Sequence, residues 1–178
     1  MLRAIGSKKD LNCKNEPSAR EFMECISDIY ENEKVRKLDK WEQHNHTSRL
    51  QHSINVAYYS YVVCKKFGWD YRSAARAGML HDLYFYDWRK PSRIRGNHAL
   101  WHPLIALDNA RKITALNNVE VDAIRNHMWP CTIMPPKYKE SYVLTFADKI
   151  CATMEFFDGL SFIKHTRDLI GRFAKSNV

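Results

Sequence analysis

The sequence predicts an all-α protein, a single-domain bundle of about seven helices that spans residues 1–178. Apolar residues recur at helical spacing along most of the chain. Strand signals are scarce, because no Asn-Gly or Asp-Gly turn lies between two runs of alternating apolar and polar residues. The length of 178 residues, of which 45% are hydrophobic, suits one domain with a core of its own.

Start and stop signals place the individual helices. Pro17 suits the first turn of a helix, and Ser48 and Asp70 are good N-caps. Gly68 is suited to end the second helix, and Gly159 separates the last two helical patterns. Residues 1–40 then form an N-terminal helical segment. The expected helices span residues 17–40, 48–67, 70–83, 103–116, 119–127, 138–157 and 160–173.

Composition and charge exclude several classes of protein. Gly and Pro number six each, too few for collagen-like or low-complexity chains. No run approaches the ~18 apolar residues of a membrane helix, and the first residues lack the apolar part of a signal peptide, so we expect no membrane partner. Five cysteines without C-x-x-C spacing are typical of reduced thiols in a cytoplasmic protein. The net charge of +8 favours an anionic partner.

Histidine and aspartate occur in a definite order on successive expected helices. The chain has eight histidines, and one of them, His81, directly precedes an acid, Asp82. Imidazole and carboxylate groups together suit divalent iron, manganese, zinc, cobalt or nickel. The ordered set is His52, His81, Asp82, His102, His127 and Asp148.

Asp148 supports this interpretation independently. It interrupts the apolar run Val143–Ala147 and precedes Ile150. A carboxylate buried there without a partner would cost several kcal/mol. Asp148 therefore requires a cation, either a metal ion or a Lys or Arg from another helix.

Short strings around these residues resemble a known family. The order His, His-Asp, Asp is the signature of the HD-domain superfamily of metal-dependent phosphohydrolases. The two added histidines are similar to its binuclear subset, and the strings His127–Pro130 and Pro135–Ser141 look like an uncharacterised bacterial branch. The resemblance covers about residues 45–157, the expected metal-site core. The matching strings are Arg49–Ser53, Leu80–Leu83, Trp101–Ala106, Ile124–His127 and Phe146–Lys149.

This resemblance implies a binuclear enzyme. A metal-bound hydroxide would attack a phosphoester or phosphoanhydride of a small, nucleotide-like anionic substrate, with His81 and Asp82 as the catalytic residues. Two divalent ions are implied; iron or manganese is favoured, and nickel, cobalt or zinc would also suit these ligands. The first ion would be held by His52, His81, Asp82 and Asp148, and the second by Asp82, His102 and His127.

Basic residues and a further histidine are candidates for binding the substrate. Arg49 either clamps a phosphate or pairs with a core carboxylate. Lys149 either replaces the lysine that many relatives have after the His-Asp pair or is an exposed surface residue. The basic loop Asp87–Asn97 joins two segments with expected metal ligands, so its arginines either contact phosphate or are solvated. The candidates are Arg49, Arg89, Arg93, Arg95, His98 and Lys149.

Other functions remain open at this point. The charge of +8 and five tryptophans are compatible with a nucleic-acid-binding protein, although the chain has no RNA-binding sheet motif, zinc finger or basic helix. A metal-binding sensor with the same fold and no turnover is a third reading. The amphipathic first and last helices could pack a homodimer. The chain lacks the GYP motif of cyclic-dinucleotide phosphodiesterases, which disfavours cyclic di-GMP as substrate.

Overall fold

The computed structural model describes residues 1–13, 15–44, 47–90 and 97–175, and it confirms an all-helical fold with seven α-helices in these ranges. None of the helices in these ranges is both long and apolar enough to cross a membrane. The α-helices are α1 (Pro17–Tyr30), α2 (Glu33–Arg36), α3 (Arg49–Lys66), α4 (Tyr71–Leu80), α5 (His98–Arg111), α6 (Asn118–Asn126) and α7 (Lys139–Lys175). A 3₁₀ helix, η1 (Lys37–Lys40), and two short strands, β1 (Glu42–His44) and β2 (Thr47–Ser48), lie between α2 and α3.

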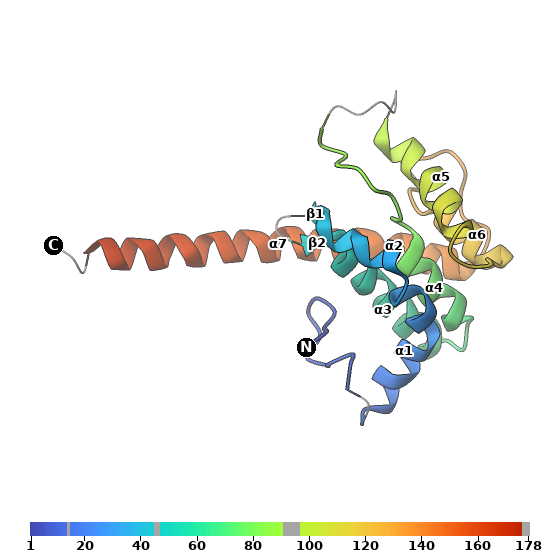
Figure 1. Cartoon of the computed structure of the whole chain (residues 1–178), viewed down its shortest axis with the longest axis horizontal. Helices are drawn as coiled ribbons and strands as arrows, with labels where there is room; N and C mark the ends of the chain where they lie inside the picture. The colour runs from blue at the N-terminus through green and yellow to red at the C-terminus, as the bar shows by residue number, and fades with distance from the viewer. Residues whose placement is uncertain (14, 45–46, 91–96, 176–178) are drawn as a thin grey trace.

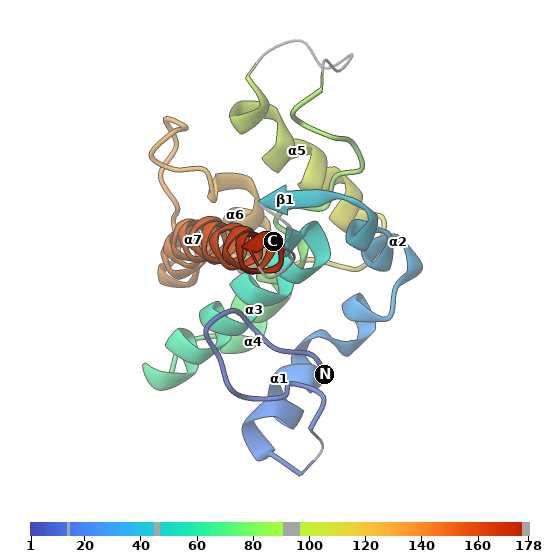
Figure 2. The ribbon, with the colours of Figure 1, turned by 90° about the vertical axis from the view of Figure 1, so that its left-hand side faces the viewer.

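Helix α3 is the centre of the bundle. It packs most extensively against α4 and next against α7, while α6 contacts α4, α5 and α7. Figure 2 looks along α7 and shows α3 and α4 on one side of it and α5 on the other. Figure 1 shows the C-terminal part of α7 running past the other helices. This arrangement brings α3, α4, α5, α6 and α7 to one region, although they are spread over most of the chain.

The predicted caps of the central helices are confirmed. The Ser48 side chain accepts a hydrogen bond from the Gln51 backbone at the start of α3, and Asp70 does the same for Ser73 at the start of α4. Gly68 has a φ of 68°, the left-handed conformation that favours glycine after a helix.

The N-terminal region differs from the prediction. A single helix over 17–40 was expected, but α1 ends at Tyr30, and Asn32 caps the separate helix α2 by accepting from the Lys34 backbone. An Asn side chain that bonds the backbone two residues on favours such a restart. The antiparallel pair β1–β2, with Glu42 opposite Ser48, was not predicted because its few residues show no alternating pattern.

Other helix boundaries also differ from the prediction: the helix expected to reach residue 116 ends at Arg111, and the helix expected to reach residue 83 ends at Leu80. Helix α5 begins at His98, capped by Asn97, so Pro103 lies inside the helix instead of opening it. Helix α7 continues through Gly159, where the sequence had suggested a break between two helices. One glycine costs a helix only about 1 kcal/mol relative to alanine, so it does not by itself end one.

Close packing of α3 on α4 depends on Gly78. A Cβ at this position would lie 2.5 Å from Cα and 2.7 Å from N of Ala57. Both are backbone atoms of the facing helix, so they cannot move aside as a side chain would. Ala57 itself is fully buried, as are the alanines near Gly78 in α4, Ala74, Ala75 and Ala77.

We therefore expect Gly78→Ala to lower the free energy of unfolding by about 3 kcal/mol, because α4 must shift away from α3. Urea denaturation measures this loss. Gly68→Ala is the control: a Cβ there meets nothing within 4 Å, so only the roughly 1 kcal/mol of a left-handed alanine is lost. A Gly78→Ala protein as stable as the parent would contradict the packing argument.

Candidate metal centre

The six residues of the ordered set meet at one place in the fold. His52 lies in α3, His102 in α5 and Asp148 in α7, while His81 and His127 directly follow α4 and α6. All four histidines are buried, and Asp82 is only 3% exposed. A cavity of about 200 Å³ opens onto this cluster. Its lining comprises Gln43, His44, Asp82, Trp88, His98, His102, His127, Met128, Asp148, Lys149 and Ala152.

Backbone carbonyls fix the rings of three of these histidines. A carbonyl oxygen can only accept a hydrogen bond, so the Nδ1 that faces it must be the protonated nitrogen of the neutral ring. The other nitrogen, Nε2, then has a free lone pair directed into the cluster. The pairs are His81 with Gly78 (2.8 Å), His102 with His98 (2.9 Å) and His127 with Ile124 (2.8 Å).

The Nε2 atoms of these rings crowd together inside the cluster. Nε2 of His102 lies 2.8 Å from Nε2 of His127, so a proton or a metal ion must lie between the two nitrogens. Nε2 of His81 is buried and has no hydrogen-bond partner in the part of the chain that the structure describes. Burial and the neighbouring His102 lower the pKa of His127 to about 3, which keeps this ring neutral. When the rings are neutral, imidazoles whose Nε2 atoms converge in this way fit a divalent metal ion.

His52 lies between two carboxylates. Its Nδ1 donates to Glu155 (2.9 Å), and its Nε2 lies 3.1 Å from Oδ1 of Asp148. Burial alone would lower the pKa of His52, but Asp148 and Glu155 outweigh it and raise the pKa to about 10. In the metal-free protein, a proton on Nε2 thus lies on the side of the ring that a metal ion would contact.

Glu155 belongs to the cluster but was not predicted from the sequence. It is fully buried and also accepts from Asn55 Nδ2 (2.7 Å). A carboxylate that accepts from the outer nitrogen of a metal-binding histidine orients the ring and makes it a better ligand. The available signal was its spacing: Glu155 follows Asp148 by two helical turns, so both lie on one face of α7.

Asp82 lies between the two halves of the cluster. Its Oδ1 is 3.3 Å from Nε2 of His102 and 3.8 Å from that of His127, and its Oδ2 is 3.8 Å from Nε2 of His81. Burial would raise its pKa, but His81 and His102 hold it well below the usual range. Asp82 is therefore ionised.

Two overlapping groups have the geometry of a metal site. In each group the ligand atoms lie within 4.8 Å of one another. A third group comprises His44, His52 and Glu155, but Nδ1 of His52 already contacts Glu155, so we interpret that carboxylate as a supporting residue. The two groups are His52, His81 and Asp148, and His81, Asp82 and His127.

The placement of Arg49 favours a structural role over the expected substrate role. It is fully buried, and its guanidinium donates to the carbonyls of Tyr84 (2.8 Å) and Tyr86 (3.3 Å) and to Oε1 of Gln43 (2.8 Å). It also lies over the Tyr84 ring, 3.6 Å from the centroid. The N–H groups of Arg49 are thus bonded to other protein groups and do not point at a substrate. Arg49 is also absent from the lining of the cavity.

The other substrate candidates are divided. His98 lines the cavity and stacks between His102 (ring centroids 4.5 Å apart) and Trp88 (5.7 Å). Lys149 also lines it, with Nζ donating to the His127 carbonyl (3.0 Å). Arg89 instead pairs with Asp87 and Glu42. Arg93 and Arg95 lie outside the described residues.

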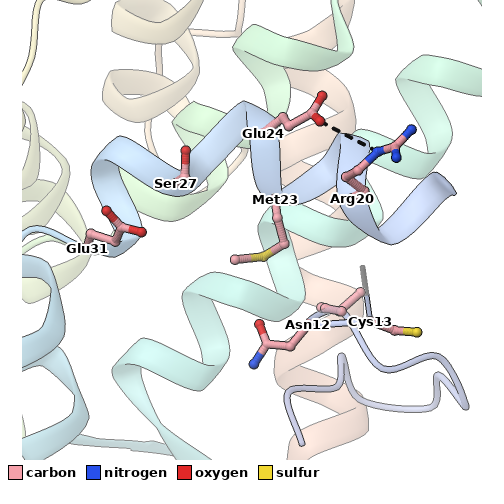
Figure 3. A pocket seen from close by; sticks show the side chains of 8 residues that line it. Asn12, Cys13, Arg20, Met23, Glu24, Ser27 and Glu31 are labelled. Atoms are coloured by element: carbon pink, nitrogen blue, oxygen red, sulfur yellow. Dashed lines mark ion pairs between the residues drawn. The ribbon is translucent and has the colours of Figure 1, made fainter. Parts of the chain in front are cut away.

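A larger hollow lies beside α1, but it lacks comparable chemistry. Its volume is about 520 Å³, and Figure 3 shows Arg20 paired with Glu24 of the same helix across 3.7 Å. No histidine lines it. Its lining comprises Leu11, Asn12, Cys13, Arg20, Met23, Glu24, Ser27 and Glu31.

Comparison with known proteins adds no assignment. No protein family matches the chain, and no curated protein or solved structure matches it. The functional argument therefore depends on the chain's own residues and geometry.

The supporting role of Glu155 leads to a prediction. Glu155→Gln keeps the size of the side chain but removes the charge that holds the His52 ring, so the affinity for Mn²⁺ should fall by about 10–100-fold. Calorimetric titration of chelator-treated protein measures this change. Glu140→Gln is the control, because Glu140 is also buried on α7 and caps the Asp70 amide away from the cluster. Equal Mn²⁺ affinity in Glu155→Gln and the parent would refute the role.

Proposed function

We propose that this protein is a metal-dependent phosphohydrolase of the HD-domain type with two divalent ions. The observation that supports this best is the pair of facing Nε2 atoms of His102 and His127, 2.8 Å apart and beside Oδ1 of Asp82. Two buried imidazole nitrogens this close to each other and to a carboxylate need a proton or a metal ion between them. A single ion at His52, His81 and Asp148 would not account for the close approach of His102, His127 and Asp82.

The proposed ligands divide between the two ions, with Asp82 shared. The ions would supply Lewis-acid activation of a phosphoryl oxygen and of the attacking water. Iron or manganese is the favoured metal for this mixed set of imidazole and carboxylate ligands. His52, His81, Asp82 and Asp148 would hold one ion, and Asp82, His102 and His127 the other.

The cavity suggests a small, phosphorylated substrate with an aromatic part. A volume of about 200 Å³ accommodates a phosphate group and the atoms next to it. The ammonium group of Lys149 and the net charge of +8 favour an anion. Trp88 is 40% exposed at the cavity and offers a ring face to a nucleobase. We therefore propose a nucleotide-like substrate.

The five unpaired cysteines fit a reducing compartment, and we propose the cytoplasm.

The first test is the metal content of untagged protein, measured by mass spectrometry. We expect about two equivalents of a transition metal per chain. Asp82→Ala should lose both ions and all phosphoesterase activity, because Asp82 is shared, whereas His102→Ala should lose the second ion first. Asp108→Ala is the control, since Asp108 pairs with Lys112 on the surface of α5 and should leave both ions bound.

The outcomes separate the alternatives. One equivalent in the parent protein would assign His102 and His127 to substrate binding. No metal after reloading with each candidate ion would refute the proposal. Two ions without turnover in a screen of nucleotides and other phosphoesters would favour a metal-binding sensor.

A further inference from the structure

We infer that Gln43 is a positioning residue: it holds the Asp82 carboxylate so that one oxygen is free for the ion at His102 and His127. The inference rests on the proposed binuclear function. Gln43 lies in β1, 39 residues before Asp82, and it is 8% exposed. Its Nε2 donates to Oδ2 of Asp82 at 2.6 Å. The other oxygen, Oδ1, is the one that faces His102 and His127.

The orientation of the Gln43 amide is determined by its other end. Oε1 lies 2.8 Å from Nε of Arg49 and 3.2 Å from the hydroxyl of Tyr84, and both groups donate to it. A flipped amide would place an NH₂ group against the Arg49 donor and an oxygen against the Asp82 carboxylate. Both contacts would be repulsive. The NH₂ group must therefore point at Asp82.

Arg49 anchors this amide to the segment that contains Asp82. Its two terminal nitrogens donate to the carbonyls of Tyr84 and Tyr86, a few residues after Asp82. Strand β1, the first turn of α3 and the segment after α4 are thereby joined in one buried hydrogen-bond network. Rotation of the Asp82 carboxylate would break its bond to an amide that is itself held at the other end.

An intervening glutamine leaves Asp82 more available than a direct ion pair would. A guanidinium binds a carboxylate with two parallel hydrogen bonds and occupies both oxygens. Here the Gln43 amide dipole lies between the Arg49 charge and the Asp82 charge and contacts only Oδ2. Asp82 is stabilised as an anion while Oδ1 makes no contact with Gln43.

The second ion should depend on Gln43 most. The proposed first ion has four protein ligands, whereas the second has only Asp82, His102 and His127. Asp82 is one of three ligands of the second ion but one of four ligands of the first. Loss of the hydrogen bond that orients Asp82 should therefore weaken binding of the second ion more. Removing such supporting contacts typically weakens metal binding by about 10–100-fold.

The test uses Gln43→Met in the full-length protein, with Mn²⁺ as the probe. Methionine keeps the length of the side chain and removes its donors and acceptor. We expect the first Mn²⁺ to bind within a few-fold of the parent affinity, and the second about 10–100-fold more weakly. The electron paramagnetic resonance signal of a coupled Mn²⁺ pair should be lost at ion concentrations that saturate the parent.

The chain offers a matched control in its other glutamine. Gln51→Met also removes two side-chain hydrogen bonds, an exposed one to the Arg3 carbonyl and a part-buried one to Asn55, but none to Asp82. It should retain both Mn²⁺ affinities and the coupled signal. Urea denaturation of both variants shows whether a change in metal binding exceeds any change in folding.

The outcomes distinguish this inference from the function on which it rests. A Gln43→Met protein with two Mn²⁺ bound as tightly as in the parent, and with the same coupled signal, overturns it. If this variant does not fold, Gln43→Asn keeps an amide that is one methylene too short to contact both Arg49 and Asp82, and the same loss of the second Mn²⁺ is expected. Failure of the parent itself to bind a second Mn²⁺ overturns the binuclear centre, and the inference with it.

Discussion

Hydrogen bonds between histidine Nδ1 atoms and backbone carbonyls are the interaction on which the site depends. The last carbonyls of an α-helix have no partner within the helix. His81 and His127 are the capping residues after α4 and α6, and each donates Nδ1–H to the carbonyl three residues earlier. The same local bond satisfies a helix end and turns Nε2 toward the cluster. Two helix ends thus supply two candidate metal ligands whose Nε2 atoms point into one cluster.

This arrangement connects the packing of the helices to the chemistry. The carbonyl that orients His81 belongs to Gly78, the residue that allows α4 to approach the backbone of Ala57 on α3. His52 lies on α3 slightly more than one turn before Ala57. The distance between the His52 and His81 rings, 5.3 Å between centroids, is therefore determined by how closely α3 and α4 pack. A change in this helix contact should therefore also change the candidate metal centre.

The sequence predicts the fold class and the first layer of the site because both have local signals. Helical periodicity and the caps at Ser48 and Asp70 predict α3 and α4, and the ordered histidines and aspartates meet as expected. Gln43 and Glu155 were not predicted, since their roles arise only when β1 and α7 pack beside α3. The role of Arg49 could not be predicted for a similar reason. Its spacing from His52 is compatible with a phosphate clamp, but the carbonyls to which its guanidinium donates come from a segment more than thirty residues away.

The buried charges of this cluster would suit a metal cation. Asp82, Asp148 and Glu155 supply three carboxylates, while Arg49 and a protonated His52 are the cations in closest contact, Arg49 only through Gln43. Lys149 approaches Asp148 only to 4.0 Å and is partly exposed. Burial would lower the pKa of His81, but Asp82 and Asp148 outweigh it and raise the pKa, so protons on His52 and His81 offset the carboxylates in the metal-free protein. A divalent ion that replaces these protons would neutralise the carboxylates and accept the imidazole lone pairs.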